Sequence, residues 1–301
     1  MLSRRHLVML GAITAFIGTP VQAQDRINVV ATFSILGDLV TNVGGDRVTV
    51  VALVGPNSDA HVFSPTPADA KTLAAAKVVF VNGLGYEGWM TRLVQASGSK
   101  AATVFVSTGV KPRRMEDEHH PGRQVTDPHA WQSIANVKIY VANIRDGLSK
   151  ADPAGKSAYE TNAQAYLAKL DALEQEVKAA IGKIPAGHRR IITTHDAFGY
   201  FGGAYGMEFI SPEGVSTEAQ PSAKDMAKII AQIRNQKIPA VFMENITDPR
   251  LMQQIAKETG AKIGGTLYSD ALSDPSGTAP TYIDMMRSNV RELSKALAPS
   301  S

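Results

Sequence analysis

The chain has 301 residues, of which 31 are Lys or Arg, 28 are Asp or Glu, and none is Cys. Without cysteine there can be no disulfide, no thiolate-ligated zinc or iron–sulfur site, no cysteine nucleophile and no lipidated cysteine at a cleaved N-terminus. Any metal site must therefore use His, Asp and Glu. Hydrophobic residues make up 44% of the chain, which predicts a globular protein with a sizeable core. A net charge of +3 over this length gives little indication of nucleic-acid binding.

Residues 1–23 have the three parts of a secretory signal peptide: Arg4 and Arg5, an apolar run over 7–17, and a small-x-Ala cleavage site ending at Ala23. The apolar run is short for a membrane span, and a buried N-terminal helix is the alternative. Cleavage after Ala23 removes 23 of 301 residues and the two arginines, which leaves 278 residues with 29 basic and 28 acidic groups. No later segment is apolar over about 18 residues. We therefore expect a soluble mature chain in the periplasm of a Gram-negative cell.

Strands and helices alternate in the first half of the mature chain. Strands are predicted at 27–33, 48–54, 77–81 and 102–106, with helices from 35 onward and at 68–76. This alternation is typical of a mainly parallel sheet with helices on its faces. Residues 111–128 are rich in Pro, Arg and acidic groups and interrupt the pattern, so we expect an exposed, mobile loop there.

One long helix is predicted after this loop. Asp152-Pro153 is typical of a helix start, and large apolar residues then recur at three- and four-residue spacing up to Ile181. A helix of about 25 residues is ~38 Å long, enough to run along two domains. Gly182 and Pro185 end it. The predicted units are the signal peptide and, after it, an N-terminal lobe, a linking helix and a C-terminal lobe at 24–150, 151–184 and 185–301.

The second half repeats the alternation of the first. Strands are predicted at 190–195, 207–210, 240–244 and 262–268, and helices at 224–235, 249–259 and 281–297. The predicted fold class is therefore α/β, with two lobes that have central, mostly parallel sheets and are linked by one long rigid α-helix.

Three histidines stand where parallel sheets bind ligands. His61 follows a predicted strand, His195 ends one, and His129 follows Asp127-Pro128. In doubly wound sheets, ligands gather outside the carboxyl ends of the strands. Neutral imidazole is the commonest biological metal ligand, and the chain offers no thiolate. Each histidine alone could be a hydrogen-bonded structural residue, but the three together predict a metal site.

Five strings then carry a resemblance to a known family: SDAHVFSPTPAD at 58–69, DPHAW at 127–131, THDAFGY at 194–200, GVSTEAQPS at 214–222 and YSDAL at 268–272. In this order they resemble the metal-binding solute-binding proteins of bacterial ABC importers. Those proteins are zinc, manganese and iron receptors with two lobes and a rigid linking helix. The resemblance covers essentially the whole mature chain.

The resemblance implies a binding protein rather than an enzyme, with four ligands between the lobes: His61, His129, His195 and Asp270. Its implied partner is the transmembrane subunit of an ABC permease, and a periplasmic metallochaperone is a further candidate. We expect a monomer that binds no nucleic acid. A periplasmic zinc hydrolase is the alternative from another class, but the sequence lacks His-Glu-x-x-His and Gly-x-Ser-x-Gly. A metal-dependent adhesin is a third.

Zinc is the predicted ion, because three imidazoles and one carboxylate can enclose tetrahedral Zn²⁺. Manganese prefers more oxygen ligands, and manganese- and iron-type relatives often carry Glu where this chain has His195. Mn²⁺ and Fe²⁺ stay as alternatives, since almost any such site ranks Zn²⁺ above them and cellular supply decides much. A bidentate Asp270 would also raise the coordination number.

Two further groups are predicted around the site. Asp196 and Glu244 could accept hydrogen bonds from imidazole N–H groups, or could simply end strands or pair with surface cations. His119 and His120 stand in an acidic loop where zinc-selective relatives often carry many histidines. They could capture a metal weakly and pass it on, or could be solvated loop residues.

Overall fold

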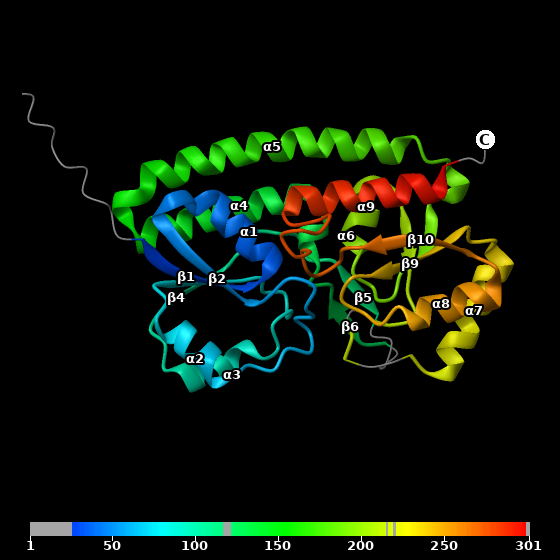
Figure 1. Cartoon of the computed structure of the whole chain (residues 1–301), viewed down its shortest axis with the longest axis horizontal. Helices are drawn as coiled ribbons and strands as arrows, with labels where there is room; N and C mark the ends of the chain where they lie inside the picture. The colour runs from blue at the N-terminus through cyan, green and yellow to red at the C-terminus, as the bar shows by residue number, and fades with distance from the viewer. Residues whose placement is uncertain (1–25, 117–121, 215, 219–220, 299–301) are drawn as a thin grey trace, which may run out of the picture.

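The computed structural model describes residues 26–116, 122–214, 216–218 and 221–298. Over these ranges the chain forms two α/β lobes side by side, and one long helix runs along both (Figure 1). The predictions for residues 1–23 and for His119 and His120 lie outside the described residues.

The N-terminal lobe is built on a four-stranded parallel sheet in the order β2-β1-β3-β4. Its strands are β1 (Ile27–Phe33), β2 (Val48–Val54), β3 (Val78–Val81) and β4 (Ala102–Phe105). Helices α1 (Ser34–Gly44) and α4 (Ile134–Ala151) lie above the sheet in Figure 1, and α2 (Pro67–Ala74) and α3 (Met90–Ser97) lie below it. The central strand β3, with the sequence VVFV, is buried throughout, as expected of a strand covered on both faces.

The C-terminal lobe repeats this plan with the order β10-β9-β7-β8, again all parallel. Its strands are β7 (Arg190–Ile192), β8 (Glu208–Ile210), β9 (Ala240–Glu244) and β10 (Lys262–Leu267). Its helices are α6 (Gly199–Tyr205), α7 (Ala223–Gln236), α8 (Arg250–Thr259) and α9 (Tyr282–Leu297). The strand order reverses between β1 and β3 and between β7 and β9, and such switch points are where open α/β sheets bind ligands.

Helix α5 (Lys156–Gly182, 27 residues) is the predicted linking helix. Its buried face consists mainly of apolar side chains at the predicted spacing: Tyr159, Ala163, Tyr166, Leu170, Leu173, Val177 and Ile181. It packs against α1 and α4 of the first lobe and α9 of the second. Asp152 does not cap it as expected, because its carboxylate binds Arg47 at 2.6 Å and the Tyr159 hydroxyl at 2.8 Å.

One continuous apolar core joins the two lobes. It contains Phe80 from β3 and Phe242 from β9, together with the buried face of α5. A second, smaller cluster lies between α7, α8 and one side of the C-terminal sheet: Ile192, Ile229, Ile233, Ile238, Val241, Met252, Ile255 and Ala256. Because interiors are close-packed, a shared core opposes any wide opening between the lobes.

The prediction of an exposed, mobile loop at 111–128 is wrong for the two ends of this segment, which the structure describes. Strands β5 (Arg114–Glu116) and β6 (Gln124–Thr126) pair antiparallel, and Asp127 is fully buried. The backbone N–H of Asp127 donates to the Arg113 carbonyl at 2.9 Å, and the two side chains form an ion pair at 3.0 Å. These bonds extend the hairpin and anchor its base to the core.

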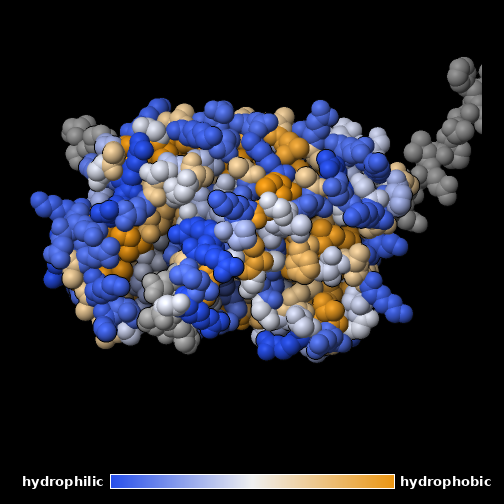
Figure 2. All heavy atoms as spheres, turned by 180° about the vertical axis from the view of Figure 1, so that it is seen from behind, coloured by the Kyte–Doolittle hydropathy of each residue, from blue (hydrophilic) through white to orange (hydrophobic). Residues whose placement is uncertain are grey.

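The surface is mixed in character. Hydrophilic side chains cover most of the face in Figure 2, with smaller apolar groups between them. Among the described residues, no helix combines the length and apolar character that a membrane crossing requires.

Candidate metal centre

Four side chains converge between the lobes: His61, His129, His195 and Asp270. One donor atom of each lies within 4.8 Å of the other three. Asp270 Oδ2 lies 3.1 Å from His61 Nε2, 3.6 Å from His129 Nε2 and 3.3 Å from His195 Nε2. The Nε2 atoms of His61 and His129 are 3.2 Å apart. The structure thus brings together all four residues that the resemblance implied.

Two of the histidines are placed by the same local turn. The backbone N–H of His61 donates to the Asp59 carboxylate at 2.8 Å, and that of His129 donates to Asp127 at 3.0 Å. An aspartate that accepts a hydrogen bond from the backbone two residues on forms an Asx turn. The repeated Asp-x-His pattern therefore aims both imidazoles at the same point from loops after β2 and β6.

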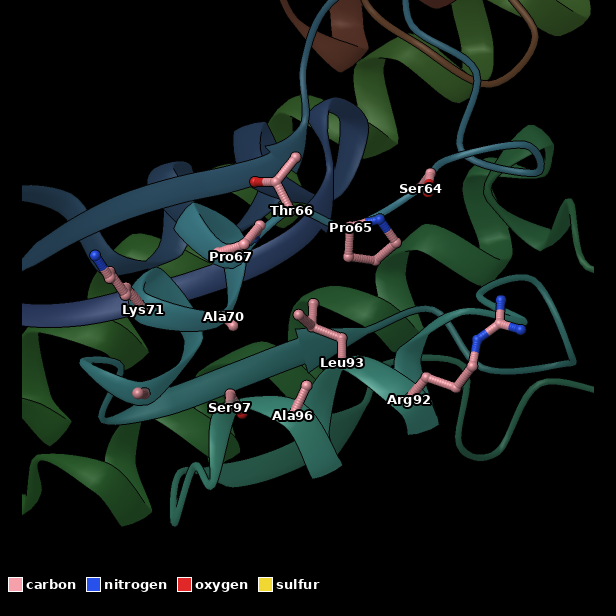
Figure 3. A pocket seen from close by; sticks show the side chains of 11 residues that line it. Ser64, Pro65, Thr66, Pro67, Ala70, Lys71, Arg92, Leu93, Ala96 and Ser97 are labelled. Atoms are coloured by element: carbon pink, nitrogen blue, oxygen red, sulfur yellow. The ribbon is translucent and has the colours of Figure 1, made fainter.

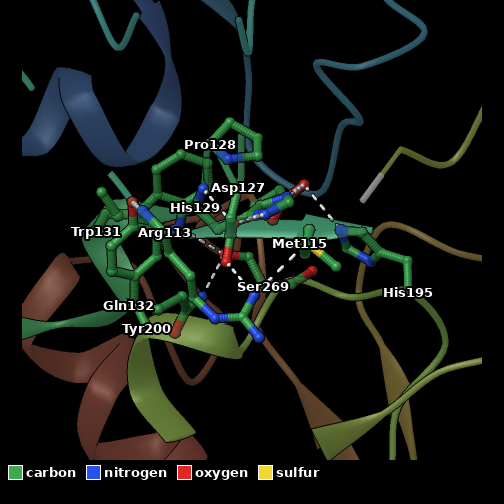
Figure 4. Close-up of polar contacts among 12 residues, drawn as sticks. Arg113, Met115, Asp127, Pro128, His129, Trp131, Gln132, His195, Tyr200 and Ser269 are labelled. Carbon is green, nitrogen blue, oxygen red and sulfur yellow. Dashed lines mark hydrogen bonds and ion pairs between the residues drawn. The ribbon is translucent and has the colours of Figure 1, made fainter. Parts of the chain in front are cut away.

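Carboxylates behind two imidazoles set the direction of each ring. His129 Nδ1 lies 2.8 Å from Asp127 Oδ1, while Asp127 Oδ2 accepts from Arg113 at 3.0 Å (Figure 4). His195 Nδ1 lies 2.6 Å from Glu244 Oε2. An ionised carboxylate can only accept, so His129 Nδ1 is a donor. The His195–Glu244 contact is an ion pair by distance and lacks hydrogen-bond geometry. Both Nε2 atoms face the centre.

Of the two carboxylates predicted behind the imidazoles, Glu244 contacts His195 and Asp196 does not. No hydrogen bond joins the Asp196 carboxylate to a histidine among the described residues, and its backbone N–H donates to the Gly214 carbonyl at 2.9 Å. The sequence reasoning missed Asp127 in this role. The Asp-x-His pattern that it shares with Asp59 is the signal that could have found it.

The comparisons with known proteins agree with this geometry. A family model described as "Zinc-uptake complex component A periplasmic" matches residues 29–296. The chain belongs to the metal-binding substrate-binding proteins of ABC transporters.

Members of this family that resemble the chain are named for different metals. The iron-binding protein YfeA of Yersinia pestis is 33% identical over 92% of this chain and 88% of its own length. The manganese-binding lipoprotein MntA of Halalkalibacterium halodurans is 34% identical over 88% of this chain and 87% of its own. The structure of the periplasmic zinc-binding protein TroA of Treponema pallidum matches with a TM-score of 0.85 at 31% identity, covering 91% of this chain and all of that one.

The charged groups of the centre shift one another's pKa values. Burial alone would lower the pKa of His129, but the charges of Asp270 and Asp127 outweigh it and raise the pKa to about 9. Burial likewise opposes the shift at His195, where Glu244 and Asp270 raise the pKa well above its usual value. The pKa of Asp270 is lowered despite burial, because His129 and His195 stabilise its charge. Burial lowers the pKa of His61. The carboxylates around the imidazoles thus favour positive charge at the centre, and a bound cation would supply it.

The donor set fits a single divalent ion. Asp270 is fully buried, and within the described part of the chain neither its oxygens nor His195 Nε2 has a hydrogen-bond partner; His195 Nε2 and Asp270 Oδ2 are in contact at 3.3 Å. Buried polar atoms without partners are rare and unfavourable, so this arrangement indicates a cation. Ligands of a tetrahedral ion at 2.0–2.1 Å would be ~3.3 Å apart, and those of a six-coordinate ion ~3 Å apart. The distances of 3.1–3.6 Å from Asp270 Oδ2 to the three imidazoles suit either ion.

A separate groove of about 810 Å³ lies between α2 and α3, on the outer side of the first lobe (Figure 3). Its charged lining residues are Lys71 and Arg92, which lie at opposite ends of it in the figure. Because both are cations, this groove does not suit a metal ion, and the candidate centre between the lobes does.

Proposed function

We propose that the protein binds one divalent transition-metal ion, zinc in preference to manganese or iron, and delivers it to an ABC importer in the inner membrane. The ligands are His61, His129, His195 and Asp270. The observation that carries the proposal is the set of three imidazoles and one carboxylate, whose donor atoms all lie within 4.8 Å of one another. Four protein ligands fill a tetrahedral shell and leave no open position for a reacting water, which suits binding rather than catalysis.

The preference for zinc rests on the nitrogen-rich donor set. Imidazole suits zinc, whereas manganese favours carboxylate, carbonyl and water oxygens. The test is metal analysis of the protein purified from periplasm. One equivalent of zinc per chain supports the proposal. One equivalent of manganese or iron would contradict the preference and leave the receptor function in place, and a metal-free protein that takes up none of the three would contradict both.

The residues around the site orient the imidazole rings and exclude water from the bound ion. Asp127 and Glu244 contact the Nδ1 side of two rings and orient them so that both Nε2 atoms point to the ion site. His129, His195 and Asp270 are all fully buried, so the bound ion is shielded from solvent. Release then requires the importer to separate ligands that come from different lobes. The shared core and α5 limit that movement.

We place the mature protein in the periplasm as a monomer, with 1–23 as its cleaved signal peptide. Several relatives are named lipoproteins, but this chain has no cysteine that could carry a lipid. The permease transmembrane subunit and its ATPase are the partners, and a periplasmic metallochaperone is a further candidate. His119 and His120 are proposed as a weak capture site. Deletion of 117–121 should slow zinc transfer from a chelator, and an unchanged rate and affinity would remove that role.

A further inference from the structure

Tyr86 lies against the metal centre but is not one of its four candidate ligands. Its side chain is 2% exposed, and its ring meets the His61 ring edge-on at 4.8 Å and the Trp131 ring at 4.9 Å. The Tyr86 hydroxyl has no hydrogen-bond partner among the described residues, and neither does Asp270 Oδ1. A buried hydroxyl without a partner is unfavourable, so its retention at this place calls for a function.

A constrained loop holds Tyr86 in this position. Gly83, Leu84 and Gly85 have φ values of 83°, 56° and 86°, and a bulky residue such as leucine rarely adopts this region. The Glu87 carboxylate fastens the loop, because it accepts from the backbone N–H of Asn82 at 2.7 Å and of Gly83 at 3.2 Å. Unusual backbone that the surroundings enforce is found mostly at functional sites.

The chemistry of the two unpartnered groups is complementary. Asp270 Oδ2 is the oxygen that faces the three imidazoles, so Oδ1 is the free one. A phenol has an ordinary pKa of about 10, so its hydroxyl is protonated at neutral pH. The phenol therefore keeps its proton and is a donor, while the carboxylate is an acceptor.

We propose that Tyr86 is a positioning residue that donates a hydrogen bond to Asp270 Oδ1 when the ion is bound and so limits Asp270 to one coordinating oxygen. With Oδ1 engaged, the ion has three nitrogens and one oxygen, the shell that zinc accepts and manganese does not favour. Tyr86 thereby sets the choice of metal without touching it. This inference rests on the proposed function, since it requires Asp270 to be a ligand.

The test compares Tyr86→Phe with wild type and with Tyr166→Phe. Tyr166 is a matched control, because its hydroxyl is also buried without a partner among the described residues but lies on α5, away from the centre. Zinc and manganese dissociation constants are measured by chelator competition on metal-free protein, and zinc coordination by X-ray absorption. Tyr86→Phe should weaken zinc binding about tenfold, as contacts behind a ligand do. Manganese binding should be unchanged or tighter, and the zinc coordination number should rise from about four to about five.

The outcomes separate the inference from the proposed function. Thermal melting should show that both variants fold, since phenylalanine keeps the ring and its contacts. A zinc-to-manganese ratio in Tyr86→Phe within twofold of wild type and of Tyr166→Phe overturns the inference, as does a wild-type zinc shell of five atoms. If wild type itself binds neither zinc nor manganese, the proposed function fails first, whatever Tyr86→Phe does.

Discussion

At the scale of single residues, the carboxylates behind His129 and His195 position these two rings. Glu244 Oε1 accepts the backbone N–H groups of Thr194 and His195 at 2.8 and 2.9 Å, which leaves Oε2 for His195 Nδ1 at 2.6 Å. The one carboxylate thus fixes both the backbone and the ring of the same ligand. Asp127 does the same for His129.

Glu244→Gln should therefore weaken zinc binding by roughly 10- to 100-fold. The single amide oxygen of glutamine is taken by the two backbone donors, so its NH₂ group faces His195 Nδ1. That contact favours the tautomer whose Nε2 carries a proton and cannot bind metal. Asp196→Asn is the control, and it should change affinity little. Isothermal titration with zinc measures the affinity of both variants. Equal losses of affinity would contradict the role of Glu244 behind His195.

Glu213 gives a pH-dependent prediction. It is 4% exposed, and burial raises its pKa from 4.5 to about 7. A carboxyl that binds its proton more tightly in the folded chain favours folding at low pH, and this contribution is lost as pH rises from 4.5 to about 7. Glu213→Gln should thus stabilise the metal-free protein at pH ~8 by about 1 kcal/mol, after allowance for solvent screening, and much less at pH ~5. Urea unfolding of this variant and of the exposed Glu218→Gln tests it, and a gain that does not depend on pH would contradict it.

The sequence predicted those parts of the candidate site that lie at strand ends or in the five strings shared with the family. His61, His129 and His195 follow strands or a proline turn, so the sequence alone predicted that they form a metal site. Asp270 depended on the resemblance, because one aspartate among many carries no local signal. The contact between His195 and Glu244 joins residues 49 positions apart, and only the pairing of β7 with β9 brings them together.

At the scale of elements, apolar spacing predicted α5 well and left α4 unpredicted. Helix α4 buries Ile134, Val137, Val141, Ile144 and Leu148, which also follow three- and four-residue spacing. Its interior contains Gly147, however, which weakens a helix by about 1 kcal/mol relative to alanine. Tertiary packing overrides this preference, because the glycine lets α4 approach the sheet.

Gly147→Ala should destabilise the protein although alanine favours helices. A Cβ there would lie 2.9 Å from Phe80 Cε1 and 2.9 Å from Val104 Cγ2, so the core must shift. We expect a loss of about 1–3 kcal/mol in the free energy of unfolding. Gly182→Ala, where nothing lies within 4 Å, is the matched control and should be neutral or stabilising. Denaturant unfolding measures both, and an equal effect of the two substitutions would contradict the packing argument.

At the scale of the whole molecule, Asp270 belongs to the second lobe in sequence but is fastened to the first. The Ser269 carbonyl accepts from Trp131 Nε1 at 2.8 Å and from Gln132 Nε2 at 2.7 Å. The backbone N–H of Leu272 donates to Ser34 Oγ at 3.0 Å. These bonds flank Asp270 on both sides, and the Ala271 carbonyl accepts in addition from Asn245 Nδ2 of the second lobe at 3.2 Å. We infer that the bonds to the first lobe keep Asp270 with His61 and His129, which divides the four candidate ligands three to one.

Opening of the lobes should therefore separate His195 from the other three ligands. In a crystal structure of the metal-free protein, we expect the distance from His195 Nε2 to Asp270 Oδ2 to exceed its 3.3 Å here. The distance from His61 Nε2 to Asp270 Oδ2 should stay near 3.1 Å. An open form in which Asp270 moves together with His195 and away from His61 would show that the bonds to Ser269 and Leu272 do not govern the movement.

The central claim is that four side chains hold one zinc ion, and calorimetric titration of metal-free wild type and His195→Ala tests it most directly. Wild type should bind one equivalent of zinc per chain. His195→Ala should keep its melting transition and lose more than about 100-fold in affinity, since removal of a ligand exceeds the loss of a group behind one. Wild-type affinity in His195→Ala, or no zinc bound by the wild-type protein, would contradict the account.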